Sequence, residues 1–204
     1  HDHIRENGFA HNSTLSNLLL NVYMKCGSIK DAENVFESMP HKNTDTWTSM
    51  IEFYVRSNHL EHAFNLFSTM VNEGINFNGV TCVNALKACT TSSSVMHVHA
   101  FVIDHGPHYN LYVRNTLLDM YCKHGSIEDA LYLFVELPVF SIVSWNTIIS
   151  GLVQHGLPEK AFELFHDMKS KGFKPDEVTF LCVIKACTNK LELLHQLHAE
   201  MNSN

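Results

Sequence analysis

The chain is short of positive charge and lacks both long apolar runs and paired cysteines. Without a run of about 18 apolar residues, a membrane-spanning helix is excluded. The six cysteines show no Cys-x-x-Cys spacing, and we expect a reducing compartment in which Cys89 and Cys187 are small buried apolar residues. Only 14 Lys and Arg oppose 21 Asp and Glu, so the net charge of −7 repels a phosphate backbone at long range. Binding of a nucleic acid would therefore depend on a local stripe of cations.

The sequence does contain a long internal repeat. Trp47 and Trp145 lie 98 positions apart. The same offset relates Gly27 to Gly125, Phe67 to Phe165 and Lys87-Ala88-Cys89 to Lys185-Ala186-Cys187. A repeating unit that cannot bury its own apolar face must stack on its neighbours. The sequence therefore predicts a solenoid, with its function on an extended concave surface.

Two kinds of helix alternate within the repeat. The second kind carries an apolar stripe at positions i, i+3, i+4 and i+7, and its first residue is a small Ala that lets a neighbouring helix approach closely. The four copies start at Ala32, Ala63, Ala130 and Ala161. A helix of the first kind precedes each copy, so the chain is predicted to be a string of helical hairpins.

Turn residues separate the two helices of each hairpin. We expect Gly27 and Gly125 to end a first helix in the left-handed conformation that glycine favours. In the other hairpins the turn is predicted at Ser57-Asn58 or His155-Gly156, and Pro158 is suited to the opening turn of the second helix.

These signals divide the chain into helix pairs. We predict pairs at 13–43, 44–78, 79–110, 111–141 and 142–176, the end of a preceding pair at 1–12, and a sixth pair that opens at 177 and is cut off at 204. Natural solenoids close with polar capping repeats, and neither end has one. We therefore expect the chain to be a piece of a longer protein.

Several motifs resemble those of pentatricopeptide repeat proteins. They are VSWNTIISG at 143–151, YMKCGSI at 23–29, GFKPD at 172–176 and Met39-Pro40. The alternation of 31, 35 and 32 residues resembles the plant subfamily that combines short, standard and long motifs. By this resemblance the short motifs are 13–43 and 111–141, the standard motifs 44–78 and 142–176, the long motif 79–110, and the truncated long motifs 1–12 and 177–204. The implied fold is all-α, a right-handed α-solenoid of stacked helix-turn-helix hairpins.

The resemblance also implies that the chain reads single-stranded RNA, one base per repeat. The reading residues are the fifth residue of the first helix and the last residue of the repeat. The pairs are Asn17 with Asn43, Thr48 with Asn78, Asn115 with Ser141 and Asn146 with Asp176. In the family's code they imply a core of 5′-pyrimidine-A-N-C-U-3′, where N is the position of Val83, which cannot bond a base edge. The alternative is that these residues are ordinary helix caps and turn residues.

Two further kinds of RNA contact follow from the same resemblance. The second residue of a motif sandwiches the base, and the apolar or aromatic residues suited to this role are Val80, Tyr112 and Val143. The last turn of a first helix faces the RNA backbone, and the cations there are Lys25, Arg56 and Lys123, with Gln154 as the departure. The alternative is that these cations only complement the negative end of their helix.

Catalysis and metal binding are not expected. His198-Ala199-Glu200 matches half of a zinc deaminase signature, but its Pro-Cys-x-x-Cys partner is absent. We therefore expect no cofactor and no metal, and any deaminase domain would lie outside this chain.

The favoured hypothesis is the RNA-recognition array of a C-to-U editing factor in a plant mitochondrion or chloroplast. By resemblance to the family, the long motif at 79–110 would contact small organellar editing accessory proteins. The first alternative is an RNA-binding factor for transcript stability, splicing or translation. The second is a protein-binding helical-repeat scaffold, which the acidic balance keeps open.

Overall fold

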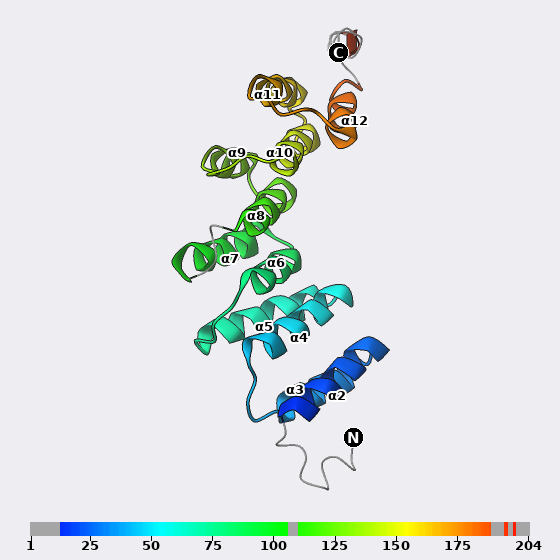
Figure 1. Cartoon of the computed structure of the whole chain (residues 1–204), viewed down its shortest axis with the longest axis vertical. Helices are drawn as coiled ribbons and strands as arrows, with labels where there is room; N and C mark the ends of the chain where they lie inside the picture. The colour runs from blue at the N-terminus through cyan, green and yellow to red at the C-terminus, as the bar shows by residue number, and fades with distance from the viewer. Residues whose placement is uncertain (1–12, 106–109, 189–193, 196–197, 199–204) are drawn as a thin grey trace. The chain divides into compact units, whose positions relative to one another are not determined.

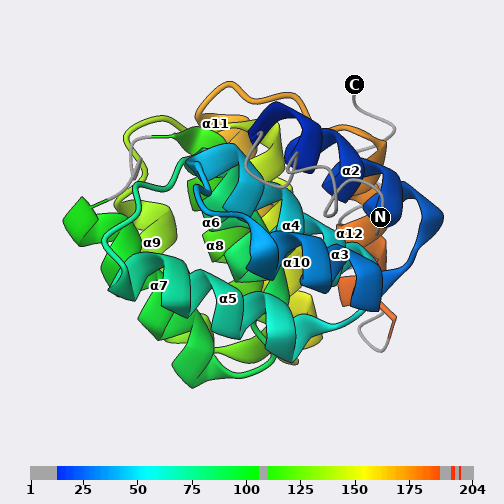
Figure 2. The same ribbon diagram turned by 90° about the horizontal axis from the view of Figure 1, so that it is seen from below.

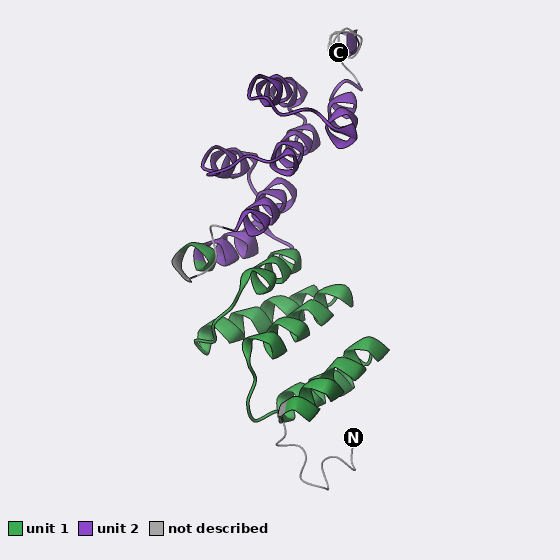
Figure 3. Ribbon diagram, in the orientation of Figure 1, with its two compact units in different colours: residues 1–89, 101–107 green, residues 90–100, 108–204 purple. Residues whose placement is uncertain are grey.

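The computed structural model describes residues 13–105 and 110–188, together with residues 194, 195 and 198. Over these residues it contains eleven α-helices, α2 to α12, and no strand (Figures 1 and 2). The chain divides into two compact units, one of His1–Cys89 and Phe101–Pro107, the other of Thr90–Ala100 and His108–Asn204 (Figure 3). The predicted motif end at 1–12 lies outside the described residues.

The first unit consists of helical hairpins. Helix α2 (Ser13–Cys26) packs on α3 (Ile29–Ser38), and α4 (Thr44–Arg56) packs on α5 (Leu60–Asn72). Helix α6 (Gly79–Ala88) then packs on both α4 and α5, so each hairpin buries its apolar face against the next one. Helix α7 (Ser92–His105) is shared between the two units.

The second unit has the same plan. Its first helices are α8 (Leu111–His124), α10 (Ile142–Gln154) and α12 (Glu177–Ala186), and α10 packs on both α8 and α12. Its second helices are α9 (Ile127–Val135) and α11 (Pro158–Ser170). The first helices therefore form a continuous row, and any side chains on their free face belong to one surface of this unit (Figure 1).

The predicted helix pairs correspond to these hairpins. Each range from 13–43 to 142–176 contains two helices in order, and 177–204 begins with α12. The residue limits of the repeats stay predictions, because helix ends do not fix the division between motifs.

The predicted apolar stripe forms the core of both units. The small residues Ala32, Ala63, Ala130 and Ala161 all have no exposed surface. In two of the four stripes a Phe meets the Trp of the next hairpin edge to face: the ring centroids of Phe36 and Trp47 lie 5.1 Å apart, and those of Phe134 and Trp145 lie 4.8 Å apart. The repeated aromatic contact therefore joins successive hairpins to each other.

One predicted turn conformation is wrong. Gly27 and Gly156 are left-handed, with φ of 75° and 70°, and Asn58 adopts φ of 60° at the turn equivalent to Gly156. Gly125 is instead extended, with φ of −113° and ψ of −153°. Glycine is needed there for a steric reason, because an added Cβ would lie 2.8 Å from Tyr121 Cδ1.

All six cysteines are free thiols, and four of them are buried. Cys89 and Cys187 are 2% and 4% exposed, which confirms that they are small buried residues. Cys82 and Cys122 are buried as well, and burial raises the pKa of each thiol to about 12. Cys26 is exposed.

We expect alkylation at pH 8 to separate these thiols. Cys26 should react with iodoacetamide in the folded protein, whereas Cys82 and Cys122 should react only after unfolding, because the reactive thiolate is scarce and shielded. Peptide mass spectrometry after brief labelling measures the three sites, with the urea-unfolded chain as the control. Equal labelling of Cys26 and Cys82 in the folded protein would contradict the burial.

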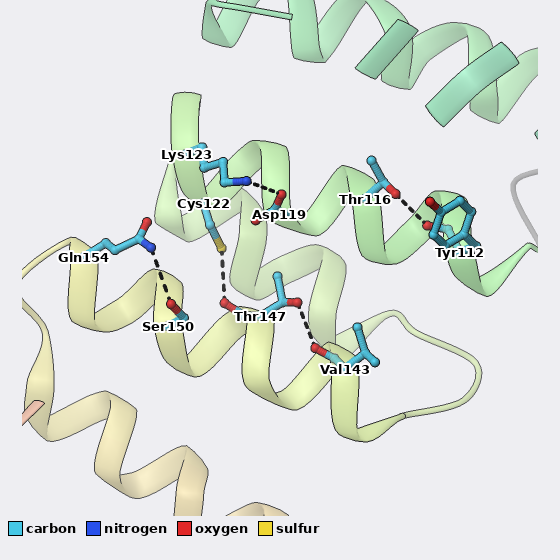
Figure 4. Close-up of polar contacts among 9 residues, drawn as sticks. All are labelled: Tyr112, Thr116, Asp119, Cys122, Lys123, Val143, Thr147, Ser150 and Gln154. Carbon is cyan, nitrogen blue, oxygen red and sulfur yellow. Dashed lines mark hydrogen bonds and ion pairs between the residues drawn. The ribbon is translucent and has the colours of Figure 1, made fainter. Parts of the chain in front are cut away.

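Helices α8 and α10 approach closely at Gly151. A Cβ on Gly151 would lie 2.8 Å from Cys122 Cβ and closer still to Cys122 Sγ. Beside this point Cys122 Sγ lies 3.9 Å from the Thr147 carbonyl oxygen (Figure 4). The absence of a side chain at residue 151 therefore sets the spacing of the two helices.

Gly151→Ala should destabilise the second unit. Overpacking of a close contact costs about 1–3 kcal/mol, and it opposes the gain of up to ~1 kcal/mol in helix propensity that Ala brings. Urea denaturation of the wild-type chain and the variant measures the difference. Ser150→Ala, one position away on the same helix, is the control and should change stability by about 0.5 kcal/mol at most. A Gly151→Ala chain as stable as Ser150→Ala would mean that the helices can move apart freely.

Candidate functional site

The last residue of each predicted repeat from 13–43 to 142–176 is the N-cap of the following first helix. The side chains that accept a hydrogen bond from the backbone N–H three residues later are Asn43, Asn78, Ser141 and Asp176. Asn110, which ends the long motif, caps α8 by accepting from the Tyr112 N–H at 2.8 Å. These residues are therefore helix caps, as the alternative interpretation holds, and capping also fixes where each side chain lies.

A buried hydroxyl completes four of these caps. It belongs to the third residue of the capped helix: Thr46, Thr81, Ser144 or Thr179, each at most 3% exposed. In α6, α10 and α12 this hydroxyl accepts from the N-cap's own backbone N–H, which makes a reciprocal capping box. These four residues were not among the predicted site residues. The signal was a cap residue followed three positions later by Ser or Thr, where a capping box more often has Glu or Gln.

Asn146 and Asp176 form a fully connected site with Thr179. Asn146 Nδ2 donates to Asp176 Oδ1 at 3.0 Å, and Thr179 Oγ1 lies 2.6 Å from Asn146 Oδ1 and 2.9 Å from Asp176 Oδ1. The bond from the Thr179 backbone N–H, and then the bond from the Asn146 amide, lower the pKa of the Asp176 carboxyl. The amide nitrogen of Asn146 therefore faces an ionised carboxylate, and its amide oxygen faces a hydroxyl.

An open cavity of about 360 Å³ lies beside this site in the second unit. Its lining includes Asn146 and Asp176, together with Val143 and Val178, whose side chains are 59% and 52% exposed. Val143 is one of the residues predicted to sandwich a base. Val178, the second residue of the next motif, is a further apolar wall that the same positional rule would have found. The cavity thus combines apolar flanks with an amide and a carboxylate.

The first unit repeats the arrangement at Asn17 and Asn43. Thr46 Oγ1 lies 3.0 Å from Asn17 Oδ1 and 2.8 Å from Asn43 Oδ1, so one hydroxyl proton serves two amide oxygens. Asn17 is half-buried and Asn43 is exposed. The two predicted partners are therefore brought together although they belong to different helices.

Thr48 and Asn78 are linked through a second hydroxyl of this kind. Thr48 Oγ1 lies 2.7 Å from Thr81 Oγ1, and Thr81 Oγ1 donates to Asn78 Oδ1 at 3.1 Å. Thr48 is only 7% exposed, so Asn78 presents most of the polar surface. Val83, predicted to read no base, is 3% exposed.

Asn115 and Ser141 are arranged differently. Ser144 Oγ, at the position equivalent to Thr179, donates to the Ser141 carbonyl oxygen at 2.8 Å. Asn115 Oδ1 is buried and has no hydrogen-bond partner within the described part of the chain. The hydroxyl link seen at Asn146 is therefore absent from this predicted pair.

The remaining predicted sandwich residues are exposed at the starts of their helices. Val80 of α6 is 55% exposed, and Tyr112 of α8 is 60% exposed. Figure 4 shows Tyr112 at the start of α8 and Val143 at the start of α10. Each apolar side chain is thus available to a ligand on the free face of its own helix.

Two of the three predicted phosphate-contacting cations form an ion pair with an acidic side chain of their own helix. Lys123 Nζ lies 2.6 Å from Asp119 Oδ2, and Arg56 Nη1 lies 4.0 Å from Glu52 Oε1 (Figure 4 shows the first pair). Both pairs are exposed and one helical turn apart, a geometry worth only a few tenths of a kcal/mol. Lys25 occupies the last turn of α2. A phosphate would therefore compete with an acid for Lys123 and Arg56 at little cost.

Two further findings concern the described residues only. No group of three His, Cys, Asp or Glu side chains among them is placed to hold a metal ion. None of their helices is long and apolar enough to cross a membrane. Glu200 of the half-signature at 198–200 lies outside the described residues.

Comparison with known proteins gives consistent matches. A family model described as "PPR repeat family" matches residues 42–91 and 141–189, and one described as "PPR repeat" matches residues 15–44 and 112–142. A mitochondrial pentatricopeptide repeat-containing protein of Arabidopsis thaliana is 34% identical over 98% of this chain, which spans 32% of that relative. A chloroplastic one from the same plant is 35% identical over 86% of the chain and 29% of the relative. The chain thus spans about a third of these relatives.

Solved structures match the fold. The crystal structure of the pentatricopeptide repeat protein PPR10 from maize superposes with a TM-score of 0.80 at 20% identity, over 99% of this chain and 30% of that one. The structure of PPR10 in complex with an 18-nt psaJ RNA element gives a TM-score of 0.79, also at 20% identity, over 98% and 31%. The predicted all-α solenoid fold is therefore confirmed.

Proposed function

The chain belongs to the pentatricopeptide repeat family, and on that premise we propose that it binds single-stranded RNA sequence-specifically, one base per repeat. The observation that carries the proposal is the site of Asn146, Asp176 and Thr179 beside an open cavity. That cavity has apolar flanks for the faces of a base and polar groups for its edge. The maize relative whose structure contains an RNA element has the same fold.

The chemistry of two pairs supports a distinction between uracil and cytosine. Asp176 can only accept hydrogen bonds, so it holds the nitrogen end of the Asn146 amide, whereas Ser141 carries a hydroxyl that can donate or accept. Uracil and cytosine present opposite groups at ring positions 3 and 4, a donor and an acceptor in uracil and the reverse in cytosine. A partner that fixes which end of the Asn amide is free can therefore decide between them. The proposed core is 5′-pyrimidine-A-N-C-U-3′, read in order by the pairs that begin at Asn17, Thr48, Asn115 and Asn146.

The wider role proposed is site recognition for C-to-U editing in a plant mitochondrion or chloroplast. It is supported by relatives whose names place them in one organelle or the other and by the resemblance of the alternating motif lengths to the editing subfamily. In this proposal the long motif at 79–110 leaves the RNA base unread and contacts an editing accessory protein. The catalytic domain would lie outside this chain.

Single-stranded RNA should bind more tightly than duplex, with a weak dependence on salt. Three backbone contacts, from Lys25, Arg56 and Lys123, correspond to a slope of log affinity against log salt of about −2, because each contributes roughly 0.7 for single strands. Fluorescence anisotropy with a labelled RNA that carries the proposed core measures the slope.

Lys123→Gln should flatten the salt slope by about 0.7. Asp119→Asn, which frees Lys123, should raise affinity without changing base preference. Affinity indifferent to strandedness would oppose the proposed function.

Asn146→Thr should change the preferred base and not only weaken binding. In the family's code Thr beside Asp corresponds to guanine, and the shorter hydroxyl side chain leaves room for a purine edge. We expect guanine to replace uracil at the last core position, with a discrimination of about 1–3 kcal/mol, the scale of one direct base contact. Competition binding with four RNAs that differ only at that nucleotide measures the base preference.

The matched control for this substitution is the neighbouring reading site. Preference for cytosine at the nucleotide assigned to Asn115 and Ser141 should stay as in the wild-type chain. Equal weakening with all four bases at the last position would show that Asn146 supports the fold and reads no base.

A further inference from the structure

In three first helices, α4, α6 and α12, the hydroxyl of the third residue has the same relation to the residues proposed to read a base, whereas in α10 the Ser144 hydroxyl bonds the Ser141 carbonyl oxygen and not Asn115. Thr46, Thr81 and Thr179 each bond the fifth residue of the preceding repeat as well as the cap. All three hydroxyls are buried, so their protons go to protein acceptors and not to water. In these three helices the third residue thus contacts both members of a proposed reading pair.

Helix α8 lacks the hydroxyl and follows a repeat that is proposed to read no base. Helix α8 has Val113 at its third position, with no exposed surface. The pair preceding it is Val83 with Asn110, which is proposed to read no base. The hydroxyl is therefore missing where the fifth residue has no polar group to orient.

We infer that this third-residue hydroxyl is a positioning residue that sets the base specificity of the preceding repeat. At the last site Thr179 Oγ1 donates to Asn146 Oδ1 at 2.6 Å, while Asp176 Oδ1 accepts from Asn146 Nδ2 at 3.0 Å. The hydroxyl and the carboxylate together hold the Asn146 amide in one of its two orientations. If the amide turned over, its oxygen would face the carboxylate. The inference rests on the proposed RNA reading and adds a third residue to the sites of Asn17, Thr48 and Asn146.

The expected consequence of losing the hydroxyl is weaker discrimination between uracil and cytosine. If the Asn146 amide can turn over, its N–H donor and its oxygen acceptor can exchange positions. The amide can then bond the edge of either uracil or cytosine. Removal of the hydroxyl leaves the carboxylate alone to hold the amide, so discrimination should fall without disappearing. The loss expected for one neutral hydrogen bond is roughly three- to tenfold.

The experiment compares Thr179→Val with Thr179→Ser. Valine keeps the branched shape and removes the hydroxyl, whereas serine keeps the hydroxyl. The ratio of dissociation constants for RNAs ending the core in C or U should fall roughly three- to tenfold in Thr179→Val and stay near the wild-type ratio in Thr179→Ser. Preference at the nucleotide assigned to Asn115 should not change in either variant.

A control separates orientation from loss of a cap. Ser126→Ala removes the side chain that caps α9 by accepting from the Asp129 N–H at 3.2 Å, far in sequence from Asn146. It should lower thermal stability about as much as Thr179→Val and leave the C-to-U ratio unchanged. If the ratio falls equally in Ser126→Ala, or stays unchanged in a folded Thr179→Val chain, the inference is wrong.

A second measurement does not need RNA. In the RNA-free protein, the side-chain amide protons of Asn146 should exchange with solvent several-fold faster in Thr179→Val than in Thr179→Ser, as measured by NMR. Faster exchange in Thr179→Val, together with a wild-type chain that shows no base preference at the last position, would support the orientation and overturn the proposed reading. Unchanged exchange with normal wild-type preference would overturn the inference alone.

Discussion

Every proposed base-reading site depends on the hydrogen bond that holds an N-cap side chain against the start of a first helix. The cap satisfies a backbone N–H that the helix leaves without a partner, and this requirement favours the Asn, Asp or Ser found at the last residue of these repeats. The same requirement places a polar atom of fixed position at the edge of the free helix face. Helix capping and base reading therefore use one side chain, and neither interpretation excludes the other.

The sites of the second unit also depend on the spacing between first helices. Asn146 can reach Asp176 only because α10 and α12 are neighbours in one row. Gly151 sets the approach of α10 to α8, and the contact of Phe134 with Trp145 ties α10 to the preceding hairpin. The packing between neighbouring first helices and against the preceding hairpin thus controls the geometry of the site.

Acidity and RNA binding are compatible in this arrangement. Asp119 and Glu52 each lie one turn from a cation, and such exposed pairs exchange partners at low cost. The acids cancel the long-range attraction of the cations and leave short-range contacts intact. Polar base contacts and apolar flanks would then carry more of the affinity than charge does, which favours selectivity over non-specific binding.

Much of this protein was decided by local sequence. Helix periodicity placed the stripes that begin at Ala32 and Ala161, and Pro158 does open α11, because these features depend on residues within one or two turns. The caps at Asn78 and Asp176 were also visible, although the hydroxyls of Thr81 and Thr179 that complete them were overlooked. The conformation of Gly125 was misjudged, because a steric contact with Tyr121 and not a left-handed turn requires glycine there.

Only the tertiary structure decided which polar groups meet. Asn146 and Thr179 are 33 residues apart in sequence, and Asn146 and Asp176 are 30 apart, so their bonds follow from how two hairpins stack. Asn115 occupies the same position in its repeat, yet its amide oxygen meets no donor in the described residues, because Ser144 bonds the Ser141 carbonyl instead. The repeat pattern determined which residues stand at each position, and hairpin packing determined their hydrogen-bond partners, because those partners lie on different hairpins.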